Sequence, residues 1–267
     1  MLLPTFVGLG AQRAGTTWAY NCLAEHPDVF MTRKKELHFF YVNYDRGLTW
    51  YKQQFAEAGD CTARGEITPD YMYHEKALRN IAKDVPEAQT FVILRNPIDR
   101  AISAFALHNQ RFSGMTFRQA CEADPELIER GMYYRYLKQV HAYLGKDKVS
   151  VFFYEDLSAK PLEFVEKLYR MAGVDDGFVP SSLETRYNRV VYPKLQRAII
   201  AARLGWTIEA VKKTPVGDWL RRRNSGSRRE SSVVSAEDMD MLRAVYRSDV
   251  ESLSEYVDRD LRHWLEQ

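Results

Sequence analysis

The stretch Gly10-Ala11-Gln12-Arg13-Ala14-Gly15-Thr16-Thr17 decides the fold of this 267-residue chain. A short apolar segment, residues 5–10, leads into it, and a helical pattern over residues 15–25 follows. A glycine-rich turn between a buried strand and a helix points main-chain N–H groups at one spot, where the helix dipole also favours an anion. The stretch therefore predicts a phosphate-binding loop within an α/β fold.

The loop differs from a nucleotide-triphosphate loop at one position. Such loops carry a lysine directly after the second glycine, where it neutralises the β- and γ-phosphates. Here Thr16 stands at that position, and the positive charge lies inside the loop at Arg13. The hydroxyls of Thr16 and Thr17 add donors at the helix N-terminus. Phosphate-type binding is favoured over a tight turn without a ligand, and a magnesium-dependent triphosphate enzyme is not favoured.

Strand and helix patterns alternate along the rest of the chain. Residues 91–94 are apolar without polar alternation, as in a strand buried on both faces, and Pro97 suits the entrance of a helix over residues 98–110. A strand over residues 149–154 precedes a helix over residues 161–171. Further expected elements are a strand over residues 63–67 and helices over residues 48–55, 135–144, 194–204 and 236–256, the last capped by Ser235.

This alternation predicts an α/β fold with a P-loop-like central parallel β-sheet, flanked by helices on both faces and followed by a helical C-terminal part. The hydrophobic share of 45% is enough for a sizeable core. No internal repeat or second domain is evident, so residues 1–267 are expected to form one domain. Residues 224–232 lack apolar side chains and are expected to form a loop.

Charge and cysteine content exclude several classes. A net charge of +2 does not suit a nucleic-acid partner, and the three cysteines are scattered without a Cys-x-x-Cys pair for zinc. The first residues lack a signal-peptide pattern, and no apolar run approaches the roughly 20 residues that span a bilayer. We expect a soluble cytoplasmic protein with no membrane span and no metal; its oligomeric state stays open.

The loop resembles the 5′-phosphosulfate loop of sulfotransferases that use 3′-phosphoadenosine 5′-phosphosulfate (PAPS), in the branch of the heparan sulfate sulfotransferases and their bacterial relatives. Further blocks similar to that family follow in the same order over nearly the entire chain. They span residues 35–40, 47–51, 65–71, 94–103, 131–133, 153–157 and 260–264. The resemblance implies a P-loop-like sulfotransferase that moves a sulfuryl group from PAPS to an acceptor hydroxyl and releases adenosine 3′,5′-bisphosphate, without a metal.

The resemblance also implies catalytic roles. Glu36 matches the glutamate that takes the proton of the incoming hydroxyl, although a solvated charge run with Arg33, Lys34 and Lys35 is the alternative. His38 would orient Glu36 or share the proton transfer, and a structural histidine is an equal alternative. Arg13 would stabilise negative charge that develops on the leaving phosphate.

Other residues would bind the nucleotide. Arg95 and Ser103 match the block that holds the 3′-phosphate, where the alternative for Arg95 is a surface salt bridge with Asp99. Arg228 and Arg229 would close over the nucleotide or belong to a plain linker. The loop residues expected to contact PAPS are Arg13, Ala14, Gly15, Thr16, Thr17 and Trp18. Trp18, Tyr71, Tyr73 and Tyr133 would line the acceptor or adenine pocket, or belong to the core.

Two departures from the family pattern concern charge. Arg13 stands where the family usually has a lysine, and Ile67 stands where the heparan branch commonly has one. The second departure argues against an acidic polysaccharide. The expected acceptor is a carbohydrate hydroxyl, followed by a secondary-metabolite or lipid alcohol. Two alternative functions remain at this point: a nucleotide or small-molecule kinase, and a non-catalytic nucleotide-binding module.

Overall fold

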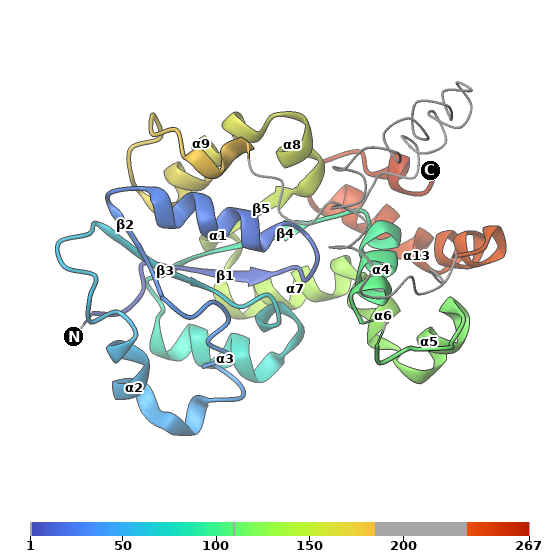
Figure 1. Ribbon diagram of the computed structural model, residues 1–267, viewed down its shortest axis with the longest axis horizontal. Coiled ribbons are helices and arrows are strands. Elements are labelled where there is room, and N and C mark those ends of the chain that lie inside the picture. Colours follow the sequence, from blue (N-terminus) through green and yellow to red (C-terminus); the bar gives the residue numbers. More distant parts are fainter. Residues whose placement is uncertain (1, 109, 185–233, 267) are drawn as a thin grey trace, which may run out of the picture. The chain divides into compact units, whose positions relative to one another are not determined.

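The computed structural model describes residues 2–108, 110–184 and 234–266 (Figure 1). These residues belong to one compact unit, formed by the chain up to residue 187 and from residue 234 on. The helix expected over residues 194–204, the loop expected over residues 224–232, and Arg228 and Arg229 lie outside the described residues. That residues 1–267 form a single domain stays a prediction.

A five-stranded parallel sheet forms the centre of this unit (Figure 1). Its strands are β1 (Phe6–Gly10), β2 (Val29–Met31), β3 (Ala63–Ile67), β4 (Gln89–Leu94) and β5 (Val149–Phe153). Their order across the sheet is β2-β3-β1-β4-β5, and every neighbouring pair is parallel. The central strand β1 is buried over its whole length, which explains its continuous apolar sequence. The predicted parallel sheet is confirmed.

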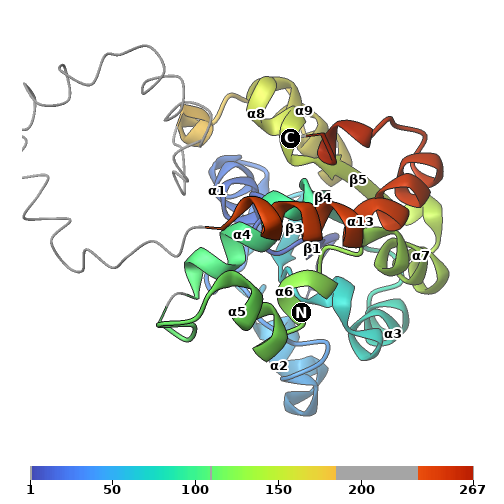
Figure 2. The ribbon, with the colours of Figure 1, turned by 90° about the vertical axis from the view of Figure 1, so that its right-hand side faces the viewer.

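Helices cover both faces of the sheet, as predicted. They are α1 (Thr16–Glu25), α2 (Gly47–Gln53), α3 (Glu75–Asp84), α4 (Pro97–Leu107), α5 (Phe117–Ala123), α6 (Glu126–Glu129), α7 (Tyr133–Leu144), α8 (Tyr154–Ala159), α9 (Pro161–Ala172) and α13 (Ala236–Tyr256). In Figure 1, α1, α8 and α9 lie on one side of the sheet, and α3 and α7 lie on the other. Helix α13 packs against α4 and α7 (Figure 2).

Local signals placed several boundaries well. Pro97 occupies the first turn of α4, and the side chain of Asn96 accepts hydrogen bonds from the first turn. Ser235 caps α13 in a capping box with Asp238, as expected from the sequence. Because Arg95 directly precedes the cap of α4, it lies at the junction of β4 and this helix.

Other boundaries differ from the prediction. Strand β4 begins at Gln89 because its N–H bonds the carbonyl of Thr5, 2.9 Å away, across the sheet. Tyr154 begins α8 and does not extend β5, and α4 ends at Leu107. The three-residue strand β2 and the helices α3, α5, α6 and α8 were not expected. A strand of three residues has no periodicity to read, and its pairing with β3 decides its conformation.

The described residues also show the state of the cysteines and were searched for membrane-spanning helices and metal-binding clusters. Cys22 and Cys121 are buried, Cys61 is half-buried, and all three are unpaired thiols. In residues 2–108, 110–184 and 234–266, no helix combines the length and apolar character needed to cross a bilayer. Across the same ranges, no cluster of three or more His, Cys, Asp or Glu side chains is arranged to hold a metal ion.

Candidate active site

Three chain segments meet at the carboxyl ends of β3, β1 and β4. The phosphate loop (residues 10–17) leaves β1, and its Ala11 N–H bonds the carbonyl of Ile93 in β4 at 2.9 Å. The Glu36 N–H bonds the carbonyl of Ile67, the last residue of β3, at 3.2 Å. Arg95 directly follows β4. This edge of a parallel sheet is where α/β proteins bind ligands, so the strand order brings the expected site segments to the expected edge.

The start of α1 is arranged to receive an anion. Gly15 caps the helix in a left-handed conformation, with φ 90° and ψ 11°, and it provides no side-chain cap. The first turn also contains no acidic residue. Its first N–H groups therefore have no partner within the helix and no competing carboxylate. A Cβ at Gly15 would lie 3.1 Å from Cδ2 of Tyr154, so a larger residue here would press against that ring.

Arg13 and Ser103 are in direct contact. Arg13 Nε donates to Ser103 Oγ at 3.0 Å, and Arg95 Nη1 donates to the main-chain carbonyl of Arg13 at 3.0 Å. Arg13 has a left-handed backbone, with φ 69°. Burial, and then the charge of Arg95, lower the pKa of Arg13. The sequence interpretation assigned Arg13 and Ser103 to different ends of PAPS, whereas the structure joins them with Arg95 in one cluster.

Arg95 keeps donor capacity that the described part of the chain does not use. Among the described residues, its buried Nε has no hydrogen-bond partner. Its Nη2 lies 4.0 Å from Asp99, at the limit of an ion pair, and the side chain of Asp99 is 50% exposed. The guanidinium lies over the ring of Tyr154, 4.8 Å from its centroid. An exposed carboxylate at that distance compensates little of the charge, so an anionic ligand fits this group better than the salt bridge alone.

The charge run before Glu36 does not form one solvated face. Lys35 Nζ lies 2.7 Å from Glu36 Oε1, and only 20% of the Lys35 side chain is exposed. Arg33 pairs with Glu57, and Lys34 is exposed. Lys35 thus holds the carboxylate of Glu36 in place, and the solvated-run interpretation applies to Arg33 and Lys34.

His38 lies beside Glu36. Its Nε2 is 3.6 Å from Glu36 Oε2, and its Nδ1 is 2.7 Å from the hydroxyl of Tyr41. Both Glu36 and His38 have left-handed backbones, with φ 65° and 49°. Two non-glycine residues in this region within three positions cost free energy that the surrounding structure must provide.

A buried carboxylate below this loop provides much of that support. Glu66, in β3, is fully buried and accepts hydrogen bonds from Tyr51 at 3.1 Å, Tyr71 at 2.7 Å and Thr68 at 2.8 Å. Burial raises the pKa of Glu66 to about 7, although the three hydroxyl donors oppose the shift. Sequence reasoning noted the block around Glu66 but gave this residue no role. A charged residue inside a buried strand was the available signal.

The same hydroxyls hold the main chain of the Glu36 loop. Phe39 N–H donates to the hydroxyl of Tyr71 at 2.9 Å, and His38 N–H lies 3.4 Å from Thr68 Oγ1. Hydrogen bonds therefore run from the loop through Tyr71 and Thr68 to the carboxylate of Glu66. Tyr71 is buried and used in this network, so it belongs to the support of the site rather than to a pocket wall.

Of the remaining aromatic candidates, Trp18 and Tyr133 are core residues, and Tyr73 is half-buried and packs against the core. Trp18 is 6% exposed and packs edge-to-face on Phe164, with ring centroids 5.9 Å apart. Tyr133 is fully buried, and Tyr73 lies under the guanidinium of Arg130 at 5.0 Å. The core interpretation of these side chains fits their burial. Contacts of Ala14, Thr16, Thr17 and the Trp18 main chain with PAPS stay predictions.

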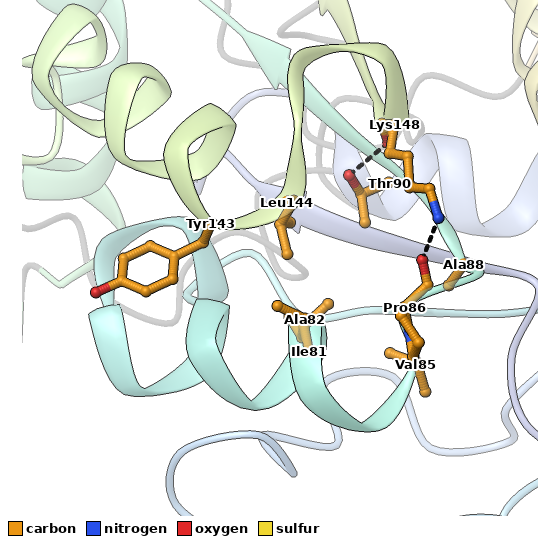
Figure 3. Close-up of a pocket in the computed structure, with 9 residues that line it drawn as sticks. All are labelled: Ile81, Ala82, Val85, Pro86, Ala88, Thr90, Tyr143, Leu144 and Lys148. Carbon is orange, nitrogen blue, oxygen red and sulfur yellow. Dashed lines mark hydrogen bonds between the residues drawn. The ribbon is translucent and has the colours of Figure 1, made fainter.

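A small, partly open cavity lies away from this edge of the sheet (Figure 3). Its volume is about 210 Å³, and it lies where β4 begins and just before β5, lined by Thr90, Ile81, Leu144 and Lys148 among others. Lys148 Nζ donates to the carbonyl of Pro86, and Thr90 Oγ1 donates to the carbonyl of Lys148 at 2.8 Å. Its polar groups are thus already bonded, and it is at the amino end of the strands. We do not assign it to the active site.

Comparisons with known proteins identify the family of the chain. Residues 4–201 match the family model described as "Sulfotransferase domain". The chain is 37% identical over 103 residues to the mouse heparan sulfate glucosamine 3-O-sulfotransferase 6, which covers 39% of this chain and 30% of the relative. It is 26% identical over 195 residues to the mouse bifunctional heparan sulfate N-deacetylase/N-sulfotransferase 4, which covers 64% of this chain and 22% of the relative. The chain thus spans less than a third of either relative.

One solved structure extends over the full length. A sulfotransferase from Alicyclobacillus acidocaldarius superposes with a TM-score of 0.73 and 22% identity, covering 99% of both chains. At this identity the match supports the fold alone. With the family model covering most of the chain, the kinase alternative is not favoured. The chain belongs to the sulfotransferase domain family.

Proposed function

We propose that the protein transfers a sulfuryl group from PAPS to an acceptor hydroxyl, with Glu36 as the general base. The observation that carries this proposal is the cluster of Arg13, Ser103 and Arg95 at the start of α1. Two guanidinium groups lie together there, and the carboxylate of Asp99 is half exposed and lies 4.0 Å from Arg95. A polyanionic ligand would relieve their mutual repulsion and use the vacant donor of Arg95.

PAPS fits this cluster because it carries anionic groups at two positions, a 5′-phosphosulfate and a 3′-phosphate. The N–H groups that begin α1, with Thr16 and Thr17, would hold the 5′-phosphosulfate. Arg95 and Ser103 would hold the 3′-phosphate. Arg13 would lie between them, since its side chain reaches Ser103 while its main chain belongs to the loop. The product adenosine 3′,5′-bisphosphate would keep most of these contacts.

The residues at the site have distinct tasks in the transfer. Glu36 would take the proton of the acceptor hydroxyl while the oxygen forms its bond to sulfur and the sulfur–oxygen bond to the leaving phosphate breaks. Lys35 orients the carboxylate through its contact at 2.7 Å. The guanidinium of Arg13 and the loop N–H groups would stabilise the charge that develops on the leaving phosphate. These tasks use residues of the chain alone and call for no metal ion.

The acceptor we favour is a carbohydrate hydroxyl, followed by a small-molecule or lipid alcohol. The named relatives act on heparan sulfate, which makes a carbohydrate the first choice for this chain. Ile67 has an uncharged, fully buried side chain, so there is no cation at the position where the heparan branch commonly has one. We infer a neutral or weakly charged carbohydrate rather than a highly sulfated polysaccharide. An acceptor screen with labelled PAPS tests this inference directly.

The test of the proposal separates donor binding from chemistry. Adenosine 3′,5′-bisphosphate should raise the melting temperature of the protein, and ATP with magnesium should not, because a ligand of the folded state stabilises it. Glu36→Gln should lose at least about 100-fold in turnover and keep that thermal shift. Glu57→Gln, which breaks the neighbouring ion pair with Arg33, is the matched control and should retain turnover. A thermal response to ATP alone, or full turnover of Glu36→Gln, would refute the proposal.

A further inference from the structure

A row of hydrogen-bonded side chains leads away from Glu36 behind His38. His38 Nδ1 lies 2.7 Å from the hydroxyl of Tyr41. That hydroxyl donates to Asp70 Oδ2 at 3.2 Å, and Arg130 Nη1 donates to Asp70 Oδ1 at 2.6 Å. Asp70 lies in the family-like block of residues 65–71 but received no role from the sequence, and Tyr41 and Arg130 lie outside the blocks.

The donors and acceptors along this row can be assigned in one consistent way. An ionised Asp70 can only accept, so the single O–H of Tyr41 is directed at the carboxylate. The phenol oxygen then has only lone pairs left for His38, and Nδ1 must carry the proton that it donates to Tyr41. In a neutral imidazole the other nitrogen, Nε2, is therefore an acceptor. Nε2 is the atom that faces Glu36, at 3.6 Å.

The far end of the row is held firmly. The side chains of Asp70 and Arg130 are each 14% exposed. Arg130 makes a second ion pair with Glu126 at 2.8 Å. This ion pair with Arg130 holds the carboxylate of Asp70 in position.

The near end is held by packing. The ring of Tyr41 stacks on His74, with centroids 4.3 Å apart and planes 17° from parallel. Burial, followed by the charge of Asp70, raises the pKa of Tyr41, so its hydroxyl stays protonated as a donor. The carbonyl of His38 accepts the N–H groups of Val42 and Asn43 at 3.1 and 3.0 Å, which holds its left-handed backbone.

We propose that Tyr41 and Asp70 are positioning residues of the transfer reaction, which hold His38 with its proton on Nδ1 so that Nε2 receives the proton from Glu36. The proposal rests on the function proposed above for Glu36. The hydroxyl proton of the acceptor passes to Glu36 Oε2, then to His38 Nε2, and from there to solvent. The imidazolium formed in between is stabilised by Asp70 through the hydroxyl of Tyr41. Hydrogen bonds of this kind are often long without substrate and shorten in the reactive complex.

The tautomer of His38 is measured without any turnover. Nitrogen-15 NMR of the imidazole, at a pH above its titration, separates an Nδ1–H ring from an Nε2–H ring. The wild-type protein should show His38 as Nδ1–H. Tyr41→Phe keeps the ring on His74 and removes the hydroxyl, so His38 should change to Nε2–H, the form that a neutral imidazole prefers in water. An Nε2–H ring in the wild type, or the same tautomer in both proteins, would overturn the proposal.

The kinetic test needs a matched control. Tyr44 also donates its hydroxyl to a carboxylate, Asp84, at 2.8 Å, and its ring packs on Phe39. Tyr41→Phe should lower kcat by about 10-fold, the factor of one hydrogen bond to a charged group, and leave the KM for PAPS unchanged. Tyr44→Phe should change neither constant.

A double-variant cycle shows whether Tyr41 acts through His38. His38→Gln should lose activity, and adding Tyr41→Phe to it should cost little more, because the loss is shared. If the two losses of activity add in the double variant, Tyr41 acts independently of His38 and only supports the fold. Asp70→Asn should produce the same change of His38 from Nδ1–H to Nε2–H. The melting temperature of this variant shows whether it folds. If no variant alters turnover while His38 still changes tautomer, the proton transfer through His38 is overturned and the hydrogen-bond row stands as structure. The turnover of Glu36→Gln then decides separately whether the proposed function of Glu36 holds.

Discussion

Arg95 donates through Nη1 to the main-chain carbonyl of Arg13, 3.0 Å away, so one arginine holds the backbone that positions the other. Arg13 in turn donates to Ser103 on α4. Residues that follow two neighbouring strands are thereby joined into one cationic group. Its charges repel, which contributes to the lowered pKa of Arg13, and the repulsion is a source of affinity for an anion that enters between them.

Arg95→Ala should weaken binding of adenosine 3′,5′-bisphosphate by about 10- to 100-fold, because it removes a charged donor and the support of the Arg13 carbonyl. Isothermal titration calorimetry measures the change. Asp99→Asn is the control, since Asp99 is half exposed and only at the edge of ion-pair distance from Arg95. It should leave the affinity within a factor of about 3. Equal losses in both variants would point to the salt bridge as the reason for Arg95.

Arg13→Lys should lower kcat/KM by about 10-fold, although it keeps the charge. Lysine has no Nε–H at the position that reaches Ser103 and no planar fork for two oxygen atoms. Ser103→Ala removes the same contact from the other side. In the double variant the two losses should not add, because both remove one hydrogen bond. A fully active Arg13→Lys enzyme would mean that the loop needs charge alone.

Gly15→Ala should lower the free energy of unfolding by more than the cost of placing an alanine in the left-handed conformation of Gly15. Gly173 is the matched control, because it also caps a helix end with φ 76° and ψ 31°, but a Cβ there meets nothing within 4 Å. Gly173→Ala should cost about 1 kcal/mol from backbone strain alone. Gly15→Ala adds a Cβ 3.1 Å from the ring of Tyr154. Urea unfolding of both variants measures the difference, and equal costs would show that Tyr154 moves away freely.

Glu66 should make the protein less stable as the pH rises from about 4.5 to 7. Its pKa is raised to about 7 by burial, while in the unfolded chain a glutamate titrates near 4.3. In this window the folded state binds more protons than the unfolded state, so the free energy of unfolding falls with rising pH, by on the order of 3 kcal/mol in total.

Glu66→Gln removes this titration and should flatten the pH dependence over the same window. Urea unfolding at pH 5 and pH 7.5 gives the slope for each protein. Glu57→Gln, at a carboxylate whose side chain is 59% exposed, should leave the slope of the wild type unchanged. If Glu66→Gln keeps the wild-type slope, Glu66 is ionised throughout and its hydroxyl donors outweigh its burial.

Much of the fold was predictable because local pattern and local structure coincide. The apolar run of β1, Pro97 at the start of α4 and Ser235 at the start of α13 each act on their immediate neighbours. The boundaries that failed depend on partners elsewhere: Gln89 joins β4 because it meets Thr5, and β2 exists because it pairs with β3.

The site divides in the same way. The candidates Arg13, Glu36, His38, Arg95 and Ser103 came from blocks of contiguous residues, and the structure brings Arg13, Arg95 and Ser103 into contact at one sheet edge and places His38 beside Glu36. Their partners were not visible in the sequence. Tyr41 is 29 residues from Asp70, and Arg130 is 60 residues from it. No local pattern requires those residues to meet.

The sequence by itself therefore determined the class of fold, the phosphate loop and the family, since glycine spacing, apolar periodicity and ordered blocks are properties of neighbouring residues. Only the tertiary structure decided that Arg13 contacts Ser103, that Glu66 supports the Glu36 loop, and that Tyr41 and Asp70 stand behind His38. Those contacts follow from the order and register of the strands, which bring distant segments to one edge. Hydrogen bonding and burial at that edge then fix the charge and direction of each group.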